Sequence, residues 1–320
     1  MDFVKNTIGK ELDTFELKFA DAVRSKTPML DRIMKYIIKR KGKQLRPMFV
    51  FLSAKLHGEV NESTYRAAAL VELLHTATLV HDDVVDESLE RRGFFSINAI
   101  WKNKIAVLVG DYLLSKGLLL STSNEDFQHL HILSDAVRQM SEGELLQMEK
   151  SRKLNLDESI YFEIIKNKTA SLLSSACAVG AYSTSKNADI TALMKDFGEK
   201  VGIAFQIKDD LFDYGSDNVG KPTGNDIREK KLTLQLIYTL NKADKSIRRK
   251  LIYILKNENK KPDSVKFVIS TVEDAGGIEY ARQKMNAYRD EALTILYKFP
   301  ESPVRKALEE LVRYTTDRKY

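Results

Sequence analysis

Two copies of one acidic pattern are the residues of this chain best suited to chemistry. Residues 82–86 and 209–213 both read Asp-Asp-x-x-Asp. Residues four apart on a helix share a face, so the first and last aspartates of each copy lie together. Clustered carboxylates repel one another and call for a cation, and their hard oxygens suit Mg²⁺, which also recruits substrate phosphates. The sequence therefore predicts a diphosphate held through Mg²⁺ by six carboxylates: Asp82, Asp83, Asp86, Asp209, Asp210 and Asp213.

Acidic clusters more often form solvated helix surface, and a single copy would fit that interpretation. Here each copy is bordered by apolar residues, since Leu79 and Val80 precede the first and Phe205 and Ile207 precede the second. Two such copies in one chain favour a metal-diphosphate site over an ordinary acidic surface.

Basic and polar residues near these motifs could complete the site. Lys43 and Arg46 lie three apart where the stretch 42–47, Gly-Lys-Gln-Leu-Arg-Pro, opens a helix, an arrangement suited to phosphate. His75 precedes Asp82 by seven residues, on nearly the same helical face. Taken singly, such residues are usually solvated or satisfied, but their recurrence around two acidic motifs favours binding. The other candidates of this kind are Arg91, Arg92, Lys168, Thr169, Gln206, Lys208, Lys221 and Lys231.

The elements that position these residues are expected to be helices. Apolar residues recur at spacings of three and four, and alternating strand patterns are scarce. All six prolines fall at segment edges, and no low-complexity linker divides the chain. We expect one all-α domain over residues 1–320, a bundle of long helices with short connections. The expected helical segments are 3–23, 29–40, 45–57, 62–86, 103–121, 126–150, 157–184, 188–214, 226–241, 244–256, 263–275, 277–297 and 303–316.

Bulk composition bounds the class of protein. The 320 residues are 43% hydrophobic and 30% charged, typical of a soluble globular protein with a sizeable core. The net charge of +6 raises the question of nucleic acid, but the basic residues look spread along the chain and no nucleic-acid motif occurs. A loose attraction to anionic membrane surfaces is weakly supported. No signal peptide is apparent, and the single cysteine, Cys177, fits a reducing cytoplasm and a packing role.

On these motifs, in order from Gly42 to about Thr233, the chain resembles the trans-isoprenyl diphosphate synthases, or polyprenyl synthetases, and within them the long-chain members. The resemblance implies an all-α isoprenoid-synthase fold, a bundle of long helices around a central cavity, usually assembled as a homodimer. It implies Mg²⁺ on an allylic diphosphate at the first aspartate set, with the second set facing it and Asp209 the foremost direct ligand there.

The resemblance also assigns the basic and polar candidates. The positions that would contact or close over the allylic diphosphate are Arg91, Lys168, Thr169, Gln206, Lys208, Lys221 and Lys231. The positions that match the isopentenyl diphosphate site are Lys43, Arg46, His75 and Arg92. Four positions depart from the common pattern: Lys41, Gln44, Lys230 and Gln235 stand where the family often has Gly, Arg, Gly and Pro.

The implied reaction is an ionisation and condensation. The allylic carbon–oxygen bond breaks to a carbocation, the double bond of isopentenyl diphosphate attacks it, and a proton leaves to the departed diphosphate. Metal ions neutralise the leaving diphosphate, and water must be excluded. No protein nucleophile is required, and no Ser-His or Cys-His arrangement is apparent. We expect the loop 220–224, Gly-Lys-Pro-Thr-Gly, to close over the ligand, with turnover falling in Lys221→Ala.

Three residues before the first motif bear on product length. Leu74, Ala77 and Thr78 lie eight, five and four residues before Asp82, on the helix face expected beneath the site. Short-chain family members place aromatic side chains at the last two positions, whereas here they are small, so the growing tail should pass. We expect a medium- to long-chain all-trans polyprenyl diphosphate, such as a quinone side-chain precursor. The alternative is that small residues merely allow close helix packing.

Other functions stay open at this point. The chain could be a short-chain geranyl, farnesyl or geranylgeranyl diphosphate synthase. A terpene cyclase shares the fold but would act on one allylic diphosphate alone, and a non-catalytic partner subunit would be inactive when purified. We expect isopentenyl and allylic diphosphates as partners, a homodimer, no nucleic acid, and a weak peripheral membrane association through the product. The sequence leaves open the product length, the primer, the dimer interface and the need for a second subunit.

Overall fold

The structure, a computed structural model, describes residues 1–39, 42–91, 93–153, 157–215 and 223–318. Two of the expected site residues, Arg92 and Lys221, lie outside the described residues, as do positions 220–222 of the expected closing loop. The elements are α1 Asp2–Ala22, α2 Pro28–Lys39, α3 Leu45–Lys55, α4 Glu62–Val85, β1 Glu90–Arg91, β2 Phe94–Phe95, α5 Ile97–Thr122, α6 Phe127–Lys153, α7 Glu158–Ile165, the π-helical turn Lys166–Ala170, α8 Ser171–Ser185, α9 Ala188–Phe212, α10 Asn225–Arg228, α11 Leu234–Lys242, α12 Lys245–Tyr253, the π-helical turn Ile254–Glu258, α13 Pro262–Asp274, α14 Gly277–Leu296 and α15 Pro303–Asp317.

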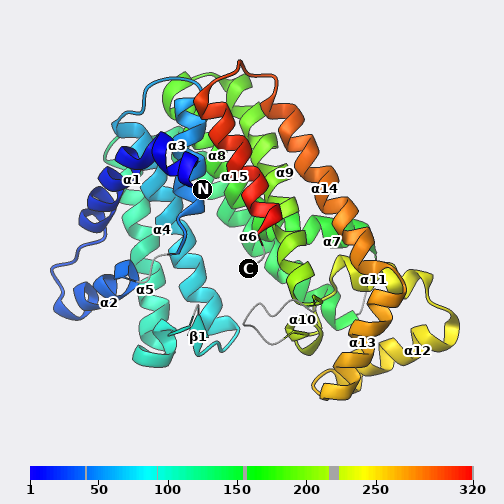
Figure 1. The fold of residues 1–320 in the computed structure, drawn as a ribbon. Coiled ribbons are helices and arrows are strands. Elements are labelled where there is room, and N and C mark those ends of the chain that lie inside the picture. Colours follow the sequence, from blue (N-terminus) through cyan, green and yellow to red (C-terminus); the bar gives the residue numbers. More distant parts are fainter. Residues whose placement is uncertain (40–41, 92, 154–156, 216–222, 319–320) are drawn as a thin grey trace. The chain divides into compact units, whose positions relative to one another are not determined.

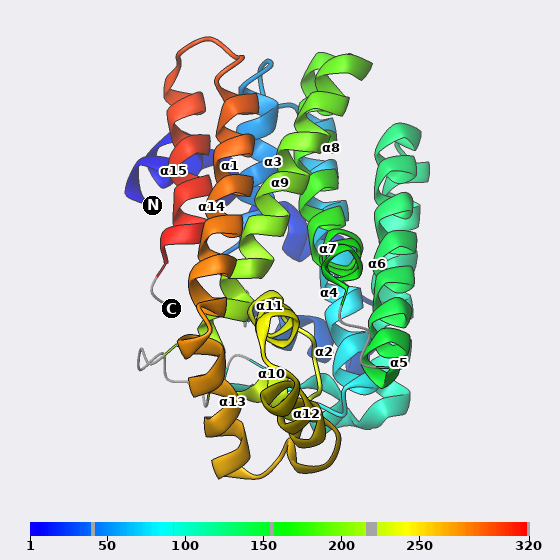
Figure 2. The ribbon, with the colours of Figure 1, turned by 90° about the vertical axis from the view of Figure 1, so that its right-hand side faces the viewer.

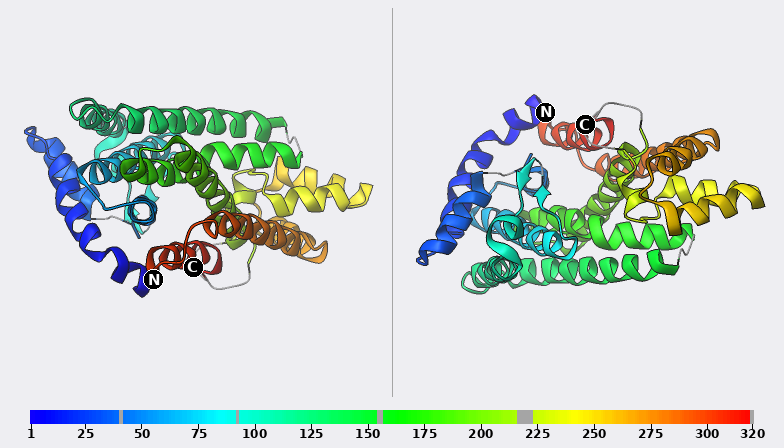
Figure 3. Two further views of the ribbon diagram at one scale, coloured as in Figure 1. Left: turned by 90° about the horizontal axis from the view of Figure 1, so that it is seen from above. Right: turned by 90° about the horizontal axis from the view of Figure 1, so that it is seen from below.

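The all-α prediction is confirmed. The exception within the described chain is a two-residue antiparallel ladder in which Glu90 lies opposite Phe95, seen as the short arrows that follow α4 (Figure 3). The predicted continuous helix over 226–241 is wrong, because α10 ends at Arg228 and α11 begins only at Leu234. Lys230 lies between them with a φ of 59°, a left-handed conformation that a helix interior does not accept.

Polar side chains set where several helices begin. Asn61 and Thr64 form a reciprocal capping box at the start of α4, which carries the first aspartate motif. Ser96 caps α5, and Lys102 interrupts that helix with a φ of 72°, next to residue 103, where the sequence pattern predicted its start. Local capping therefore fixes where α4 begins, and hence the position of Asp82 and Asp86 at its C-terminal end.

The chain divides into two compact units, and the division falls within α6, α8, α9 and α15. The first comprises Met1–Val137, Ser175–Lys195 and Ser302–Leu308; the second comprises Arg138–Ser174, Asp196–Glu301 and Glu309–Tyr320. Each unit is therefore assembled from stretches that are far apart in sequence. The expectation of one domain over 1–320 stays a prediction.

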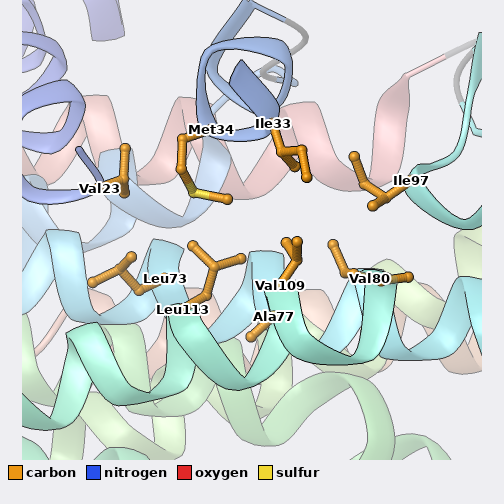
Figure 4. Close-up of a cluster of buried hydrophobic side chains, with 10 residues drawn as sticks. Val23, Ile33, Met34, Leu73, Ala77, Val80, Ile97, Val109 and Leu113 are labelled. Atoms are coloured by element: carbon orange, nitrogen blue, oxygen red, sulfur yellow. The ribbon is translucent and has the colours of Figure 1, made fainter. Parts of the chain in front are cut away.

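The core of the first unit joins α4 and α5, which lie side by side (Figure 1), to α2. Met34 of α2 points toward Leu113 of α5, and Ile33 of α2 points toward Val109 of α5, all with 2% exposure or less (Figure 4). Burying side chains of this size drives the helices together, at roughly 1.5–3 kcal/mol for each one fully buried.

One glycine permits a close helix approach in this unit. The backbone of Val50 in α3 lies so near Gly180 of α8 that a methyl group there would overlap it. The hydroxyl of Thr184, one turn later, donates to the carbonyl of Ala54 at 2.9 Å. Helices α3 and α8 are therefore packed backbone to backbone, which fixes the start of α3 and hence Arg46.

The second unit has two neighbouring hydrophobic clusters. One gathers Tyr161 and Ile165 of α7 with Ile207 of α9, Leu234 of α11 and Met285 of α14. The other packs α10, α11, α12 and α13 around residues that include Leu240, Leu251, Leu255, Val265 and Val268. Figure 2 shows α11, α13 and α14 beside one another, as their contacts require. These clusters hold the end of α9, where the second aspartate motif lies.

Helix α5 is long and apolar enough, by length and composition alone, to cross a membrane. A core helix of a soluble protein passes the same test, and a third of the apolar stretch, 33%, is buried inside the structure. Its exposed side chains include Leu108 at 63% and Leu119 at 61%.

Candidate active site

The first aspartate motif lies at the end of α4. Asp82 is half-buried, Asp86 is exposed and caps the helix, and the Asp86 N–H donates to the Asp82 carbonyl at 2.8 Å. Helical geometry therefore continues to Asp86, which places Asp82 and Asp86 one turn apart on the same side of α4.

Asp83 has a different environment from its neighbours. It is 4% exposed, and Arg91 of β1 donates from Nε to its carboxylate at 2.7 Å. Burial raises the pKa of the Asp83 carboxyl, and the Arg91 guanidinium opposes that rise. The amide of Asn98 donates to the Asp83 backbone carbonyl at 3.1 Å. Asp83 and Arg91 thus tie the short β-hairpin to the end of α4.

Two of the residues matched to the isopentenyl diphosphate site lie together in the first unit. Arg46 of α3 approaches His75 of α4, with 2.9 Å between Nη1 and Nε2. Since a guanidinium can only donate, His75 accepts through Nε2 and carries its proton on Nδ1. His75 is 9% exposed, and Lys43 lies exposed just before α3. The His75 ring therefore helps to orient the Arg46 guanidinium.

The three residues expected to control product length lie on α4 close to His75 in sequence. Ala77 is fully buried within the core cluster shared by α2, α4 and α5 (Figure 4), and Leu74 is 6% exposed. Thr78 is half-buried, and its hydroxyl donates to the His75 carbonyl at 2.9 Å. The packing of Ala77 matches the alternative in which a small residue allows close helix contact, whereas Thr78 keeps partial exposure.

The second aspartate motif ends α9, and its middle member is buried. Asp210 is 8% exposed and accepts from the Tyr161 hydroxyl at 2.8 Å and from Gln206 Nε2 at 2.7 Å. Burial raises the pKa of Asp210 to about 6, while these two donors hold it down. Burial also raises the pKa of Tyr161 well above its usual value, so the phenol remains a donor.

The last aspartate of the motif organises the segment that follows. The Asp213 carboxylate accepts from the backbone N–H groups of Asn225 at 2.8 Å and Asp226 at 2.9 Å, at the start of α10. Burial raises the pKa of Asp213, and it raises the pKa of Asp226 to about 8, with Asp210 and Asp213 adding to the second rise. Several carboxyl groups therefore converge here in a poorly solvated region.

Asp209 bears a cationic partner. The Arg318 guanidinium, from the residue after α15, donates to the Asp209 carboxylate. The same guanidinium lies over the rings of Phe205, 4.3 Å from its centroid, and Phe212, 5.3 Å from its centroid. The Asp209 side chain is 41% exposed, so it is the most accessible contact point among the paired carboxylates of this motif.

The Lys168–Thr169 pair lies in the π-helical turn between α7 and α8. Such turns are rare and often occur at functional sites. The Thr169 hydroxyl donates to Gln206 Oε1 at 2.7 Å, and Gln206 in turn donates to Asp210. Lys168 forms an ion pair with Glu144 of α6 and reaches Gln147 at 3.5 Å. One hydrogen-bonded series therefore links Thr169, Gln206, Asp210 and Tyr161.

The two remaining basic candidates of the second unit have acidic or aromatic neighbours. Lys208 Nζ lies 4.9 Å from the centroid of the Phe212 ring. Lys231 pairs with Glu229 at 2.5 Å and with Asp226 at 3.8 Å. Gln235, at the position where the family often has Pro, donates to the Asp210 carbonyl at 2.8 Å, a bond that proline could not make.

The carboxylates fit a hard divalent cation that retains outside ligands. Within the described chain no three His, Cys, Asp or Glu side chains form a ready-made metal cluster. Mg²⁺ is usually held by one or two carboxylates plus substrate phosphates rather than by an all-protein cage. The pairing of Asp209 with a guanidinium shows in addition that this carboxylate accepts a cation.

Sequence reasoning missed two contributors to this region. Tyr161 and Arg318 reach the second motif from 49 and 109 residues away. Asp226, which follows the motif closely in sequence, donates its backbone N–H to Asp213. No spacing rule could have found Tyr161 or Arg318, because tertiary packing alone brings them in.

Comparisons with known proteins agree with this architecture. Residues 27–272 match the Polyprenyl synthetase family. An all-trans-nonaprenyl-diphosphate synthase (geranyl-diphosphate specific) from Rhodobacter capsulatus is 35% identical over 301 residues, 93% of this chain and 92% of that protein.

Two solved structures are also similar. A Caulobacter crescentus polyprenyl synthase complexed with calcium and isoprenyl diphosphate has a TM-score of 0.92 and 31% identity, covering 100% of this chain and 98% of that chain. A Bacteroides thetaiotaomicron geranylgeranyl pyrophosphate synthase has a TM-score of 0.85 and 36% identity, covering 99% and 98%.

Proposed function

The chain belongs to the polyprenyl synthetase family and is a trans-prenyltransferase, and from that premise we propose that it condenses isopentenyl diphosphate head to tail with an allylic diphosphate in the presence of Mg²⁺. The proposed product is a medium- to long-chain all-trans polyprenyl diphosphate, suited to serve as the precursor of a quinone side chain. The observation that carries the proposal is the pair of Asp-Asp-x-x-Asp motifs at the ends of α4 and α9 in a chain of this family.

The residues proposed to hold Mg²⁺ are Asp82 and Asp86 of the first motif and Asp209 of the second, with Asp83, Asp210 and Asp213 completing the two sets. When bound, Mg²⁺ would supply neutralisation of the charge that develops on the leaving diphosphate. The Caulobacter structure, which is complexed with calcium and isoprenyl diphosphate, supports the choice of a hard divalent cation.

The chain's own residues would bind, orient and shield. Arg46 and His75, joined at 2.9 Å, would present a guanidinium to the diphosphate of the isopentenyl substrate, with Lys43 as its neighbour. Thr169, Gln206 and Tyr161 would hold Asp210 in one orientation, so that the motif is preorganised. Lys168, Lys208, Lys231 and Arg91 are the cations proposed to meet the allylic diphosphate. Arg92 and Lys221 keep the assignments that the resemblance gives them.

Product length is the finer part of the proposal. The absence of aromatic side chains at Ala77 and Thr78 supports a long product, as does the nonaprenyl relative at 35% identity. The geranylgeranyl structure at 36% identity supports a shorter one. Thr78 is the stronger of the two positions, because Ala77 is packed within the helical core and Thr78 is half-buried.

The test is product analysis by mass. The purified chain is incubated with Mg²⁺, isopentenyl diphosphate and either geranyl or farnesyl diphosphate. We expect a polyprenyl diphosphate longer than geranylgeranyl diphosphate. A product that stops at geranylgeranyl would establish the short-chain alternative, a hydrocarbon formed without isopentenyl diphosphate would establish a cyclase, and no turnover by the folded chain would indicate a required second subunit.

We further propose a homodimer in the cytoplasm. The exposed apolar side chains along α5 support a second copy as their cover: Val107, Leu108, Leu118 and Leu119. Val107 and Leu118 are eleven residues apart, as are Leu108 and Leu119, and residues at this spacing lie on the same face of a helix. The single cysteine, buried and with a pKa raised by burial to about 12, supports a reducing compartment in which it stays a packing residue. We also propose a weak peripheral association with membranes through the product.

A further inference from the structure

The net positive charge of this chain is concentrated in one segment. The chain has 51 Lys and Arg against 45 Asp and Glu, and residues 242–266 hold nine of the former and three of the latter. The other 295 residues carry 42 of each and are neutral overall. The basic residues themselves are spread along the chain, since 42 of the 51 lie outside this segment, and only their excess over the acidic residues is local.

This segment folds as an amphipathic basic helix in the second unit. Leu251 and Leu255 are fully buried in the cluster that α12 shares with α11 and α13. Lys245, Arg249 and Tyr253 follow one another at intervals of four residues on the exposed side of α12. The helix is thus anchored by its apolar side and presents cations outward.

Two of the three acidic residues of the segment, Asp244 and Glu258, form local hydrogen bonds or ion pairs. Asp244 caps α12 by accepting from the N–H groups of Ser246 at 2.8 Å and Ile247 at 2.9 Å. Glu258 pairs with Lys261 at 2.7 Å and accepts from Ser264 at 3.0 Å. Six exposed cations make up what we call the α12 basic surface: Lys245, Arg248, Arg249, Lys256, Lys260 and Lys266.

Apolar side chains are exposed among these charges. Tyr253 is 55% exposed and Ile247 is 38% exposed. Tyrosine and aliphatic side chains at the edge of a basic amphipathic helix suit the headgroup layer of a bilayer, where the ring meets the acyl boundary and the cations meet anionic headgroups. A nucleic acid would match the charge equally well, but its phosphate backbone would give the exposed Ile247 side chain no apolar partner.

We propose that the α12 basic surface docks this protein onto membranes that contain anionic phospholipids. The biological reason rests on the proposed function, because a long polyprenyl diphosphate is poorly soluble in water and must pass into a bilayer. The attraction itself rests only on charge and exposure. It falls off within a Debye length and weakens as salt screens it.

The test is co-sedimentation with vesicles in the absence of substrate. Vesicles of phosphatidylcholine with phosphatidylserine should bind the protein, and phosphatidylcholine alone should not. The variant Lys245→Gln/Arg249→Gln/Lys256→Gln should lose binding by about tenfold or more. Raising the salt from about 0.1 M to about 0.5 M should release the wild type. A matched control, Lys10→Gln/Lys104→Gln/Lys298→Gln, removes three exposed cations elsewhere and should bind nearly as the wild type does.

Three results would overturn the proposal: equal vesicle binding by the triple variant and the wild type, equal loss in the control variant, or preference for single-stranded RNA over the anionic vesicles. Because binding is measured without substrate, it is independent of turnover. Condensation assayed in detergent solution should be the same in the α12 variant and the wild type, so a failure of docking and a failure of the synthase activity are told apart.

Discussion

Arg318 pairs with Asp209, the carboxylate of the second motif that we propose as a metal ligand. Its guanidinium donates to Asp209 and lies over Phe205 and Phe212, so this carboxylate already has a cationic partner when no metal is bound. A cation entering at Asp209 must displace that guanidinium. The C-terminal arginine and the metal are therefore competitors for one carboxylate.

Removing the arginine should tighten metal binding. In Arg318→Gln, the dissociation constant for Mg²⁺ or Mn²⁺ measured by calorimetry without substrate should fall by about threefold to tenfold, since a cation–carboxylate pair of this exposure contributes roughly 1 kcal/mol. Arg313→Gln serves as the control, because Arg313 lies on α15, the helix just before Arg318, and pairs with Glu309 at 3.0 Å. Weaker metal binding in Arg318→Gln would contradict the competition.

The buried carboxyl of Asp226 gives the second residue-scale prediction, for the metal-free protein. Its pKa is about 8 in the fold against an ordinary 3.8, mainly because burial disfavours the charged form. Between these values the folded chain keeps a proton that the unfolded chain has lost, so stability falls as pH rises through that window. Below it the carboxyl is neutral in both states and the penalty vanishes.

Asp226→Asn should remove that penalty. We expect its unfolding midpoint at pH about 8.5 to exceed that of the wild type by about 2–8 °C, with a smaller difference near pH 5, measured by calorimetry or circular dichroism. Asp274→Asn, at an exposed acid of α13, should show no such pH-dependent gain. A midpoint for Asp226→Asn below that of the wild type at the higher pH would refute the assignment.

At the scale of elements, helical periodicity located the helices that carry both motifs. The expected segments 62–86 and 188–214 match α4 and α9 within two residues. The break after α10 was missed because Leu232 and Leu234 continue an apolar pattern, while Lys230 turns the chain with positive φ. The β-hairpin was missed because two residues a strand are too few to show an alternation.

The residues of the site likewise fall into those that the local sequence could predict and those that it could not. Residues whose placement follows from spacing on one helix, such as Asp82 with Asp86, could be predicted. Partners from distant segments, such as Tyr161 and Arg318, could not, because nothing local marks them. Asp83 and Asp213 belong to the motifs but are engaged by Arg91 and by the backbone of α10, a difference that the Asp-Asp-x-x-Asp pattern conceals.

Helix α4 gives the element-scale prediction about product length. Thr78→Phe should shorten the main product by several isoprene units, because an aromatic ring on the half-buried face would obstruct a growing tail. Ala77→Phe should also shorten it but lose stability, since overpacking a fully buried position costs about 1–3 kcal/mol. Product mass and the unfolding midpoint are measured together.

Leu17→Phe provides the control for added aromatic volume, because Leu17 is 75% exposed on α1. Its product should match that of the wild type. If Thr78→Phe remains folded and makes the wild-type product, this face of α4 has no part in termination, and the small residues serve helix packing alone.

At the scale of the whole molecule, the exposed stripe of α5 predicts assembly. Leu108→Glu/Leu119→Glu should convert a dimer into a monomer in light scattering after gel filtration, since two buried charges per subunit would face each other across the interface. Ser270→Glu, at an exposed polar position of α13, is the control for added surface charge and should leave the dimer intact. If the variant with both leucine substitutions remains a dimer, the dimer interface does not lie on this face of α5.

We propose that condensation needs both aspartate motifs, each of them as a ligand of divalent cations. This proposal is tested most directly by the rate of isopentenyl diphosphate incorporation at saturating Mg²⁺ in Asp82→Asn and Asp209→Asn, beside Asp13→Asn at an exposed acid of α1. The account predicts that each motif variant, folded as the wild type is, loses at least about a hundredfold in turnover while Asp13→Asn is unaffected. Wild-type rates in either motif variant would contradict it.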